Sequence, residues 1–250
     1  MKSTEQTPEL MAHRGYASLY PENTIEAVVA AGEAGITQIE FDVQLTKDGI
    51  PVVLHDMSLQ RTTGLKQSIF ATDLADLSDI EANYTELFGD ACSGIRIPTL
   101  ESMLDLLSER PEWRFFVEIK RESIQQFGST FVIDQLLPLI YEHLAQIVII
   151  SFDYEFLVEL CHRSDVEVGW VLSEYSDQAE QAAVALDPDY LIVNYRRLPP
   201  APEPLWPGAW HWACYEVTEA TLARQLLSRG IDIVSSMAAP ALQRQLGAEV

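Results

Sequence analysis

Short apolar runs recur along the chain, and segments with helical periodicity separate most of them. Many of these runs are rich in Val, Ile, Phe or Trp, the residue types that favour β-strands. The pattern predicts eight strands, which are Glu9–Ala12, Gln38–Leu45, Arg114–Ile119, Ile147–Phe152, Glu167–Leu172, Tyr190–Asn194, Ala209–Glu216 and Asp232–Ser235.

Helical patterns occupy most of the intervals between the predicted strands. The first begins with Asn23 and has Glu26 three residues later, which resembles a capping box, and Gly35 is a natural stop. The predicted helices are Asn23–Ala34, Thr99–Glu109, Ile133–Ala145, Tyr154–Arg163, Gln178–Leu186, Thr218–Arg229 and Ala241–Leu246. The segment Leu198–Pro207 is rich in proline, so the helix after the sixth strand is short or missing.

The alternation of strands and helices predicts parallel strands joined by crossover helices. Eight such strands favour a closed (β/α)8 TIM barrel, with a doubly wound open sheet as the alternative. The 250 residues suit a single barrel domain over 1–250, and two small domains would also fit this length. We expect a small insertion after the second strand, at about 46–98, in which Glu81–Cys92 caps the barrel mouth. A barrel places chemistry at the carboxyl ends of its strands.

The second strand leads into a predicted β-hairpin. Asp48-Gly49 is a strong signal for a two-residue turn between two extended runs. If these two residues form the loop, Asp42 on the outgoing strand lies opposite His55 on the returning one. The hairpin would then bring a carboxylate and an imidazole together.

Composition limits the partners and the compartment. The formal net charge of −22 would repel nucleic-acid backbones and anionic membranes, so neither is an expected partner. The cysteines Cys92, Cys161 and Cys214 are scattered, which argues against structural zinc and favours a reducing compartment. Met1–Leu10 has no apolar signal core, and no apolar run approaches the ~20 residues of a membrane-spanning helix. We therefore expect a soluble cytoplasmic protein, while its oligomeric state stays open.

Carboxylates gather near the predicted strand ends. Strand side chains alternate, so Glu40 and Asp42 share one face of the second strand, and Glu118 and Lys120 share one face at the end of the third. Two like charges on a half-buried face repel each other, and a cation would relieve the repulsion. A structural salt bridge between Glu118 and Lys120 is the plainer alternative. As hard oxygen ligands, the three carboxylates suit Mg²⁺ or Ca²⁺ better than zinc.

Histidines and cations complete the candidate site. The sequence "MAHRG" places His13 and Arg14 at the end of the first strand, although either alone could be an ordinary loop or surface residue. Arg14 and Lys120 carry charge suited to a phosphate. His13 and His55 could supply the two proton transfers of phosphodiester cleavage, one at the nucleophile and one at the leaving alkoxide. The nucleophile could be water or a neighbouring hydroxyl of the substrate.

The motifs "HRGYASLYPENT", "IEFDVQLTKDG", "VVLHD", "IPTLESML" and "VEIK" follow one another in an order that resembles the glycerophosphodiester phosphodiesterase family. The resemblance implies a (β/α)8 barrel that hydrolyses glycerophosphodiesters to sn-glycerol 3-phosphate and an alcohol. It implies catalytic roles for His13 and His55, and phosphate contacts for Arg14 and Lys120. The metal ligands that it implies are Glu40, Asp42 and Glu118, for Mg²⁺ or Ca²⁺ with Mn²⁺ as a further option. Glu22 and Asn23 lie in "PENT", where Asn23 is interpreted mainly as a helix cap, with a contact at the barrel mouth as the alternative.

The C-terminal third departs from the family pattern. Its seventh strand reads "WACY", with Tyr215 in a position usually held by Asn, and "SSMAAP" replaces a Thr-Asp pair. These changes leave the preferred alcohol open. Trp212 is predicted to pack against the substrate, with a buried barrel tryptophan as the alternative. The same two alternatives apply to Phe152, for which core packing is favoured.

Two other functions remain open from the sequence. The same chemistry would permit a lysophospholipase D-type phosphodiesterase, which would need an apolar groove at the mouth. A catalytically inactive relative that binds a phosphate metabolite is the second alternative. The complete set of histidines, carboxylates and Lys120 argues against inactivity.

Overall fold

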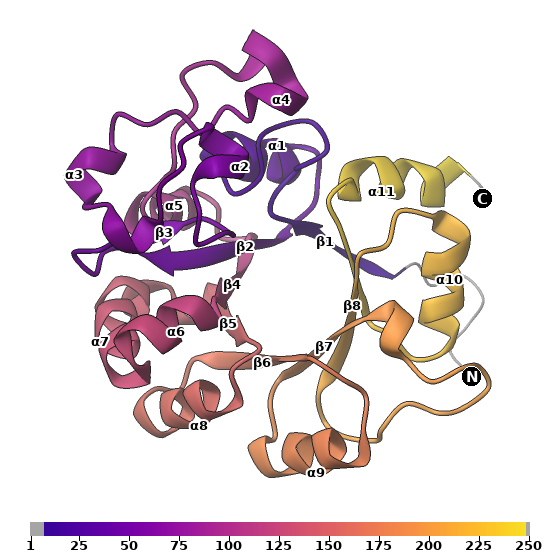
Figure 1. Cartoon of the computed structure of the whole chain (residues 1–250). Coiled ribbons are helices and arrows are strands. Elements are labelled where there is room, and N and C mark those ends of the chain that lie inside the picture. Colours follow the sequence, from indigo (N-terminus) through magenta and orange to yellow (C-terminus); the bar gives the residue numbers. More distant parts are fainter. Residues whose placement is uncertain (1–7, 249–250) are drawn as a thin grey trace.

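Eight parallel strands form a closed barrel in the computed structural model, which describes residues 8–248 (Figure 1). The strands are β1 (Glu9–His13), β2 (Gln38–Leu45), β4 (Arg114–Ile119), β5 (Ile147–Ser151), β6 (Glu167–Leu172), β7 (Tyr190–Asn194), β8 (His211–Tyr215) and β9 (Ile233–Ser236). Strand β1 pairs with both β2 and β9, which closes the sheet on itself. The (β/α)8 barrel prediction is confirmed, and the open doubly wound sheet is excluded.

Strand alternation divides the core into two layers. On β2, Ile39, Phe41 and Val43 point outward into the large core under the helices, where Phe41 meets Phe115 edge to face at 5.2 Å. A smaller cluster fills the barrel interior, including Phe116 and the apolar side chains of β5 to β9. Glu40 and Asp42 are thereby left on the inner face of β2.

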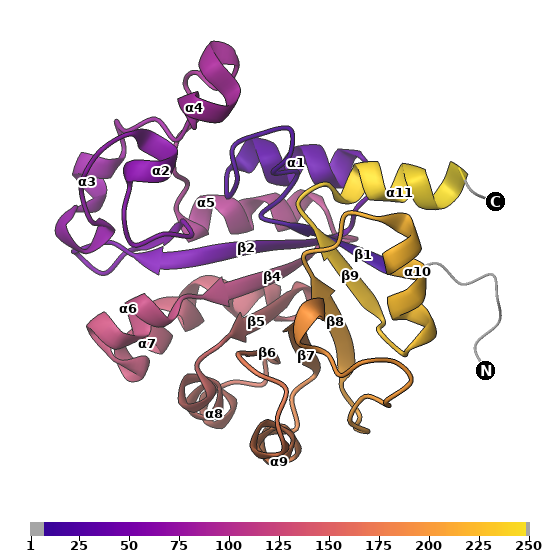
Figure 2. The same cartoon turned by 45° about the vertical axis from the view of Figure 1, so that its right-hand side comes forward.

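Helices surround the barrel in the expected order (Figures 1 and 2). They are α1 (Ile25–Glu33), α5 (Leu100–Leu104), α6 (Arg121–Phe127), α7 (Ser129–Ile140), α8 (Tyr154–Arg163), α9 (Asp177–Leu186), α10 (Ala220–Ser228) and α11 (Ala239–Ala248). Helix α6 was not predicted, and a single 3-10 turn, Tyr195–Arg197, follows β7, as the prolines indicated. Within 8–248, none of the helices has both the length and the apolar character needed to cross a membrane.

The hairpin register differs from the prediction by one residue. Strand β3 (Pro51–Val53) pairs Val53 with Val43, and the backbone N–H of Leu54 donates to the carbonyl of Asp42. The loop contains three residues because Gly49, at φ +81°, donates its N–H to Thr46 and takes the left-handed position of such loops. The prediction that Asp42 lies opposite His55 was therefore wrong, and His55 lies beyond the end of β3.

The insertion after β3 packs on a small core of its own. Its elements are α2 (Gln60–Thr63), α3 (Leu74–Leu77), α4 (Thr85–Phe88) and the 3-10 turns Ile69–Ala71 and Gly89–Cys92. Leu59, Ile69 and Leu77 are fully buried in this satellite core. Both views show the insertion beside α1, with α3 and α4 at its outer edge (Figures 1 and 2). That the insertion caps the mouth stays a prediction.

Candidate active site at the barrel mouth

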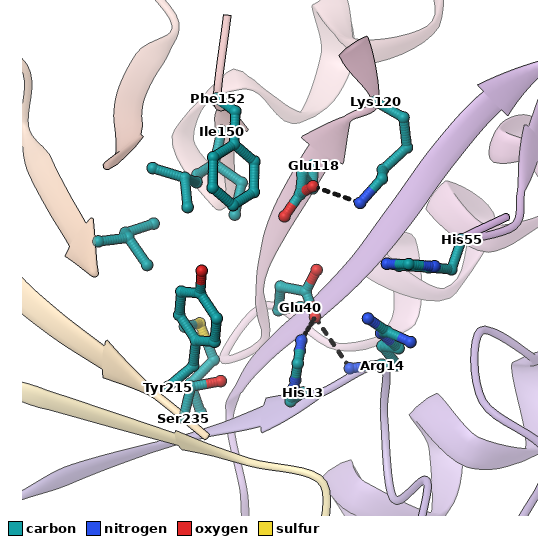
Figure 3. Close-up of a pocket in the computed structure, with 13 residues that line it drawn as sticks. His13, Arg14, Glu40, His55, Glu118, Lys120, Ile150, Phe152, Tyr215 and Ser235 are labelled. Carbon is teal, nitrogen blue, oxygen red and sulfur yellow. Dashed lines mark hydrogen bonds and ion pairs between the residues drawn. The ribbon is translucent and has the colours of Figure 1, made fainter. Parts of the chain in front are cut away.

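A pocket of about 190 Å³ opens at the carboxyl ends of the strands, where a barrel places its chemistry. Its wall has two halves (Figure 3). The polar half comes from β1, β2, β4 and the loop after β3, and is formed by His13, Arg14, Glu40, His55, Glu118 and Lys120. The apolar half includes Ile150, Phe152, Val171, Ile192 and Tyr215, which come from β5 to β8 or from just beyond their ends.

Two carboxylates of the polar half, Glu40 and Glu118, lie close to a third, Asp42, which is buried and does not itself line the cavity. Glu40, Asp42 and Glu118 each offer an oxygen, and these oxygens lie within 4.8 Å of one another. Burial and the charge of Asp42 raise the pKa of Glu40 to about 8, and the same two causes raise the pKa of Glu118. Burial also opposes the ionisation of Asp42, but Lys120 and Arg14 outweigh it and hold the pKa of Asp42 well below its usual range.

The carboxylate cluster fits a divalent cation. Glu40 Oε2 accepts a hydrogen bond from the backbone N–H of Arg14 at 2.9 Å, whereas Oε1 is buried without a hydrogen-bond partner among the residues described. A buried carboxylate oxygen without a partner is costly, and a cation would satisfy it. Mg²⁺ and Ca²⁺ both prefer oxygen ligands, and carboxylates are the usual protein source of them. The cluster could therefore hold one such ion.

Asn23 has a different role from the one expected. The helix cap of α1 is Thr24, whose hydroxyl accepts from the N–H of Ala27 at 3.2 Å. Asn23 is buried and donates its amide to Asp42 Oδ2 at 2.9 Å, while its Oδ1 accepts from the backbone N–H of Asp42 at 3.0 Å. Its assignment as a cap was wrong, and it orients Asp42 instead.

His13 faces the cavity from the end of β1. Its Nδ1 lies 2.8 Å from Glu216 Oε2, and its Nε2 lies 3.8 Å from Glu40 Oε2. Burial disfavours the charged ring, but the carboxylates of Glu40 and Glu216 outweigh it and raise the pKa of His13. Glu216 is itself fixed by the N–H of Met237 at 2.9 Å. The sequence analysis missed Glu216, whose only signal is an acidic residue directly after a barrel strand.

His55 lies across the polar half from His13, and its ring points into the cavity (Figure 3). Its Nδ1 lies 2.6 Å from Asp56 Oδ1. With Nδ1 engaged, Nε2 is the nitrogen left for the cavity. Each histidine is thus held at one nitrogen by a carboxylate, Glu216 or Asp56, an arrangement that fixes ring orientation.

Arg14 and Lys120 flank the carboxylates. Lys120 Nζ lies 2.7 Å from Glu118 Oε1 and 3.3 Å from Asp42 Oδ1, and Arg14 Nε lies 3.1 Å from Asp42 Oδ2. Burial opposes both charges, but the neighbouring carboxylates raise the pKa of Lys120 and of Arg14. Lys120 therefore forms the salt bridge with Glu118 that was the plainer alternative, and it also lines the cavity, where a phosphate contact stays a prediction.

The structure places Trp212 away from the pocket. On β8, Ala213 and Tyr215 face inward, so the alternating side chain of Trp212 points outward and packs near Tyr175 at 6.2 Å and other aromatic rings. Trp212 is buried and does not line the cavity, which favours the alternative of a buried barrel tryptophan over a substrate contact. Phe152 packs against the barrel-interior cluster, as favoured, and also lines the cavity.

Comparisons with known proteins agree on one family. The model of the "Glycerophosphoryl diester phosphodiesterase family" matches residues 13–195. A glycerophosphodiester phosphodiesterase of Bacillus subtilis is 30% identical over 205 residues, covering 74% of this chain and 69% of that protein. One of Caldanaerobacter subterraneus is 35% identical over 147 residues, which is 58% of each chain. The matched segments span about half the length of several curated relatives, as with the 45% of the Bacillus altitudinis protein.

A solved structure extends the likeness over nearly the whole chain. A phosphodiesterase of Oleispira antarctica, in complex with its product sn-glycerol-3-phosphate, has a TM-score of 0.84 and 26% sequence identity. The match covers 96% of this chain and 97% of that one.

Proposed function

Because the chain belongs to the glycerophosphoryl diester phosphodiesterase family, we propose that it hydrolyses glycerophosphodiesters to sn-glycerol 3-phosphate and an alcohol. The observation that carries the proposal is the polar half of the pocket, where two oriented histidines, two carboxylates and two cations line one cavity and a third carboxylate, Asp42, lies within 4.8 Å of the other two. The product bound by the Oleispira antarctica enzyme has the chemistry expected here.

The two histidines would move the protons of the reaction. One imidazole takes a proton from the nucleophile as its oxygen bonds to phosphorus, and the other gives a proton to the alkoxide whose bond to phosphorus breaks. Their exposed nitrogens face the cavity, because Glu216 and Asp56 occupy the opposite ones. The nucleophile is water or the neighbouring hydroxyl of the glycerol unit, and the same two histidines serve either route.

The carboxylates would hold one divalent cation, Mg²⁺, Ca²⁺ or Mn²⁺, through Glu40, Asp42 and Glu118. Such an ion polarises a phosphoryl oxygen and stabilises negative charge as it grows there. Arg14 and Lys120 also line the cavity, and the neighbouring carboxylates keep both side chains charged. Both would therefore bind and orient the phosphate.

Turnover of glycerophosphocholine tests the proposed activity. We expect choline and sn-glycerol 3-phosphate in equal amounts in the presence of a divalent cation. Choline phosphate and glycerol would mean cleavage of the wrong ester bond. Binding of sn-glycerol 3-phosphate without turnover of any diester would instead identify a metabolite-binding relative.

Substitution of Tyr215 is expected to alter head-group preference. Tyr215 lies on the apolar wall and Trp212 on the opposite face of the same strand. Tyr215→Phe should change ratios of kcat/KM between alcohols by about 3- to 10-fold, the size of one hydrogen bond. A panel of glycerophosphocholine, glycerophosphoethanolamine and lysophosphatidylcholine measures this. Trp212→Phe is the matched control, and equal losses on every substrate would make Tyr215 a packing residue.

Metal binding should stabilise the protein more at high pH. Glu40 is protonated below about 8 in the folded protein but only below about 4.5 when unfolded, so the metal-free fold loses stability as pH rises through this window. The raised pKa values of His13 and Glu118 act in the same direction. The Mn²⁺-induced increase in Tm should therefore be larger at about pH 8 than at about pH 5. Glu40→Gln should weaken this dependence, and an equal increase at both pH values would contradict it.

A further inference from the structure

A continuous run of charged side chains joins His55 to the carboxylate cluster. The run begins with Asp56, whose Oδ1 contacts Nδ1 of His55. The other oxygen of Asp56, Oδ2, accepts a hydrogen bond from Arg61 Nε at 2.6 Å. Arg61 then donates two hydrogen bonds to Glu22, at 2.8 Å and 2.7 Å. Glu22 accepts from Arg14 at 2.9 Å, and Arg14 pairs with Asp42 as described above.

The run connects three separate pieces of the fold. His55 and Asp56 follow β3, Arg61 belongs to α2, and Glu22 lies in the loop between β1 and α1. Arg61 therefore connects the insertion to the barrel loop that carries Glu22. The guanidinium of Arg61 also lies over the ring of Tyr84, 5.5 Å from its centroid, and Tyr84 directly precedes α4.

These contacts differ from an ordinary surface ion pair, which contributes little. The side chain of Glu22 is only 9% exposed and accepts from two guanidinium groups. Burial disfavours its charge, but the hydrogen bonds from Arg61 and the charge of Arg14 outweigh burial and lower the pKa of Glu22. The planar guanidinium of Arg61 meets a carboxylate on two sides, a geometry that lysine cannot reproduce.

We propose that Arg61 is a positioning residue for the phosphodiesterase reaction, which holds Asp56 against His55 and fixes that histidine relative to the metal-binding carboxylates through Glu22 and Arg14. This inference rests on the proposed function. Arg61 does not line the pocket and would touch neither the substrate nor the cation. Its effect is geometric, because a reacting group displaced by about 1 Å can lose about 100-fold in rate.

The test compares Arg61→Gln with Lys47→Met. The control breaks an exposed ion pair of the same insertion, in which Lys47 Nζ lies 2.9 Å from Asp73. Arg61→Gln should lower kcat by about 10- to 100-fold, with KM and Mn²⁺ affinity within about threefold of the unmodified protein. Arg61→Lys, which can keep one partner but not both, should recover only part of the loss. Lys47→Met should keep full activity.

A double-mutant cycle separates positioning from a merely structural role. If Arg61 acts through Asp56, Arg61→Gln combined with Asp56→Asn should lose little more kcat than Asp56→Asn alone. Long-range ¹H–¹⁵N spectra of the histidines should also show one His55 tautomer, with the proton on Nδ1, give way to a mixture in Arg61→Gln. Should Arg61→Gln fail to fold, Glu22→Gln breaks the same run from the barrel side and is judged by the same measurements.

The outcomes distinguish this inference from the proposed function. An unmodified protein that turns over no glycerophosphodiester overturns both. Normal turnover by the unmodified protein and an unchanged kcat in Arg61→Gln overturns the positioning role alone. The positioning role is also overturned if the loss of activity in Arg61→Gln equals the loss of folded protein. It is overturned as well if the kcat losses of Arg61→Gln and Asp56→Asn multiply in the double variant.

Discussion

Replacing His13 or His55 with alanine is expected to lower kcat by about 10²- to 10⁴-fold in each case, the usual contribution of one general acid–base group. Both rings face the cavity and both are held at Nδ1 by a carboxylate, which leaves Nε2 of each ring for the cavity. We expect neither to be a metal ligand, because the three carboxylates could supply the protein oxygens of a hard-cation site.

Metal affinity separates catalysis from ligation in these variants. Isothermal titration with Mn²⁺ should give nearly unchanged affinity for His13→Ala and His55→Ala. His162→Ala, on the exposed last turn of α8, is the matched control and should keep both activity and affinity. A histidine variant that loses metal binding together with activity would be a ligand, and the assignment would then be wrong.

Replacing Glu118 with glutamine is expected to abolish metal binding and lower kcat by at least on the order of 10³-fold, because a Lewis acid contributes several kcal/mol to phosphoryl chemistry. The amide keeps the shape of the side chain but removes one of three anionic oxygens. It also leaves Lys120 with one fewer carboxylate partner.

Chelation provides the second measurement of metal dependence. EDTA should remove activity from the unmodified protein, and added Mg²⁺, Ca²⁺ or Mn²⁺ should restore it. Glu122→Gln, an exposed carboxylate on α6, should behave as the unmodified protein does. Full activity after exhaustive chelation, or a crystal soak that places the ion elsewhere, would disprove the carboxylate site.

Local patterns were sufficient to predict the barrel and most of the polar half of the pocket. Alternation alone places Glu40 with Asp42, and Glu118 with Lys120, because it depends only on neighbours within one strand. The hairpin register failed because a three-residue loop around Gly49 has the same dipeptide signal as a two-residue loop.

Contacts between distant parts of the chain were beyond the local pattern. Glu216 meets His13 across 203 residues of sequence, and no periodicity relates the two. The outward orientation of Trp212 depends on which residue of β8 is in register with the neighbouring strands. Asn23 was predicted to be the helix cap because Asn and Thr both cap helices and the sequence does not distinguish Asn23 from Thr24. Only the hydrogen bond from Asn23 to Asp42 shows its role.

The two halves of the pocket wall give this barrel an uneven tolerance to amino-acid replacement. On the apolar side, exchange of Ile150, Val171 or Ile192 for another aliphatic residue reshapes the cavity without removing a charge or a hydrogen bond. On the polar side, almost every exchange leaves a buried charge without its partner. Directed evolution of a new substrate range should therefore accumulate its substitutions on β5 to β7.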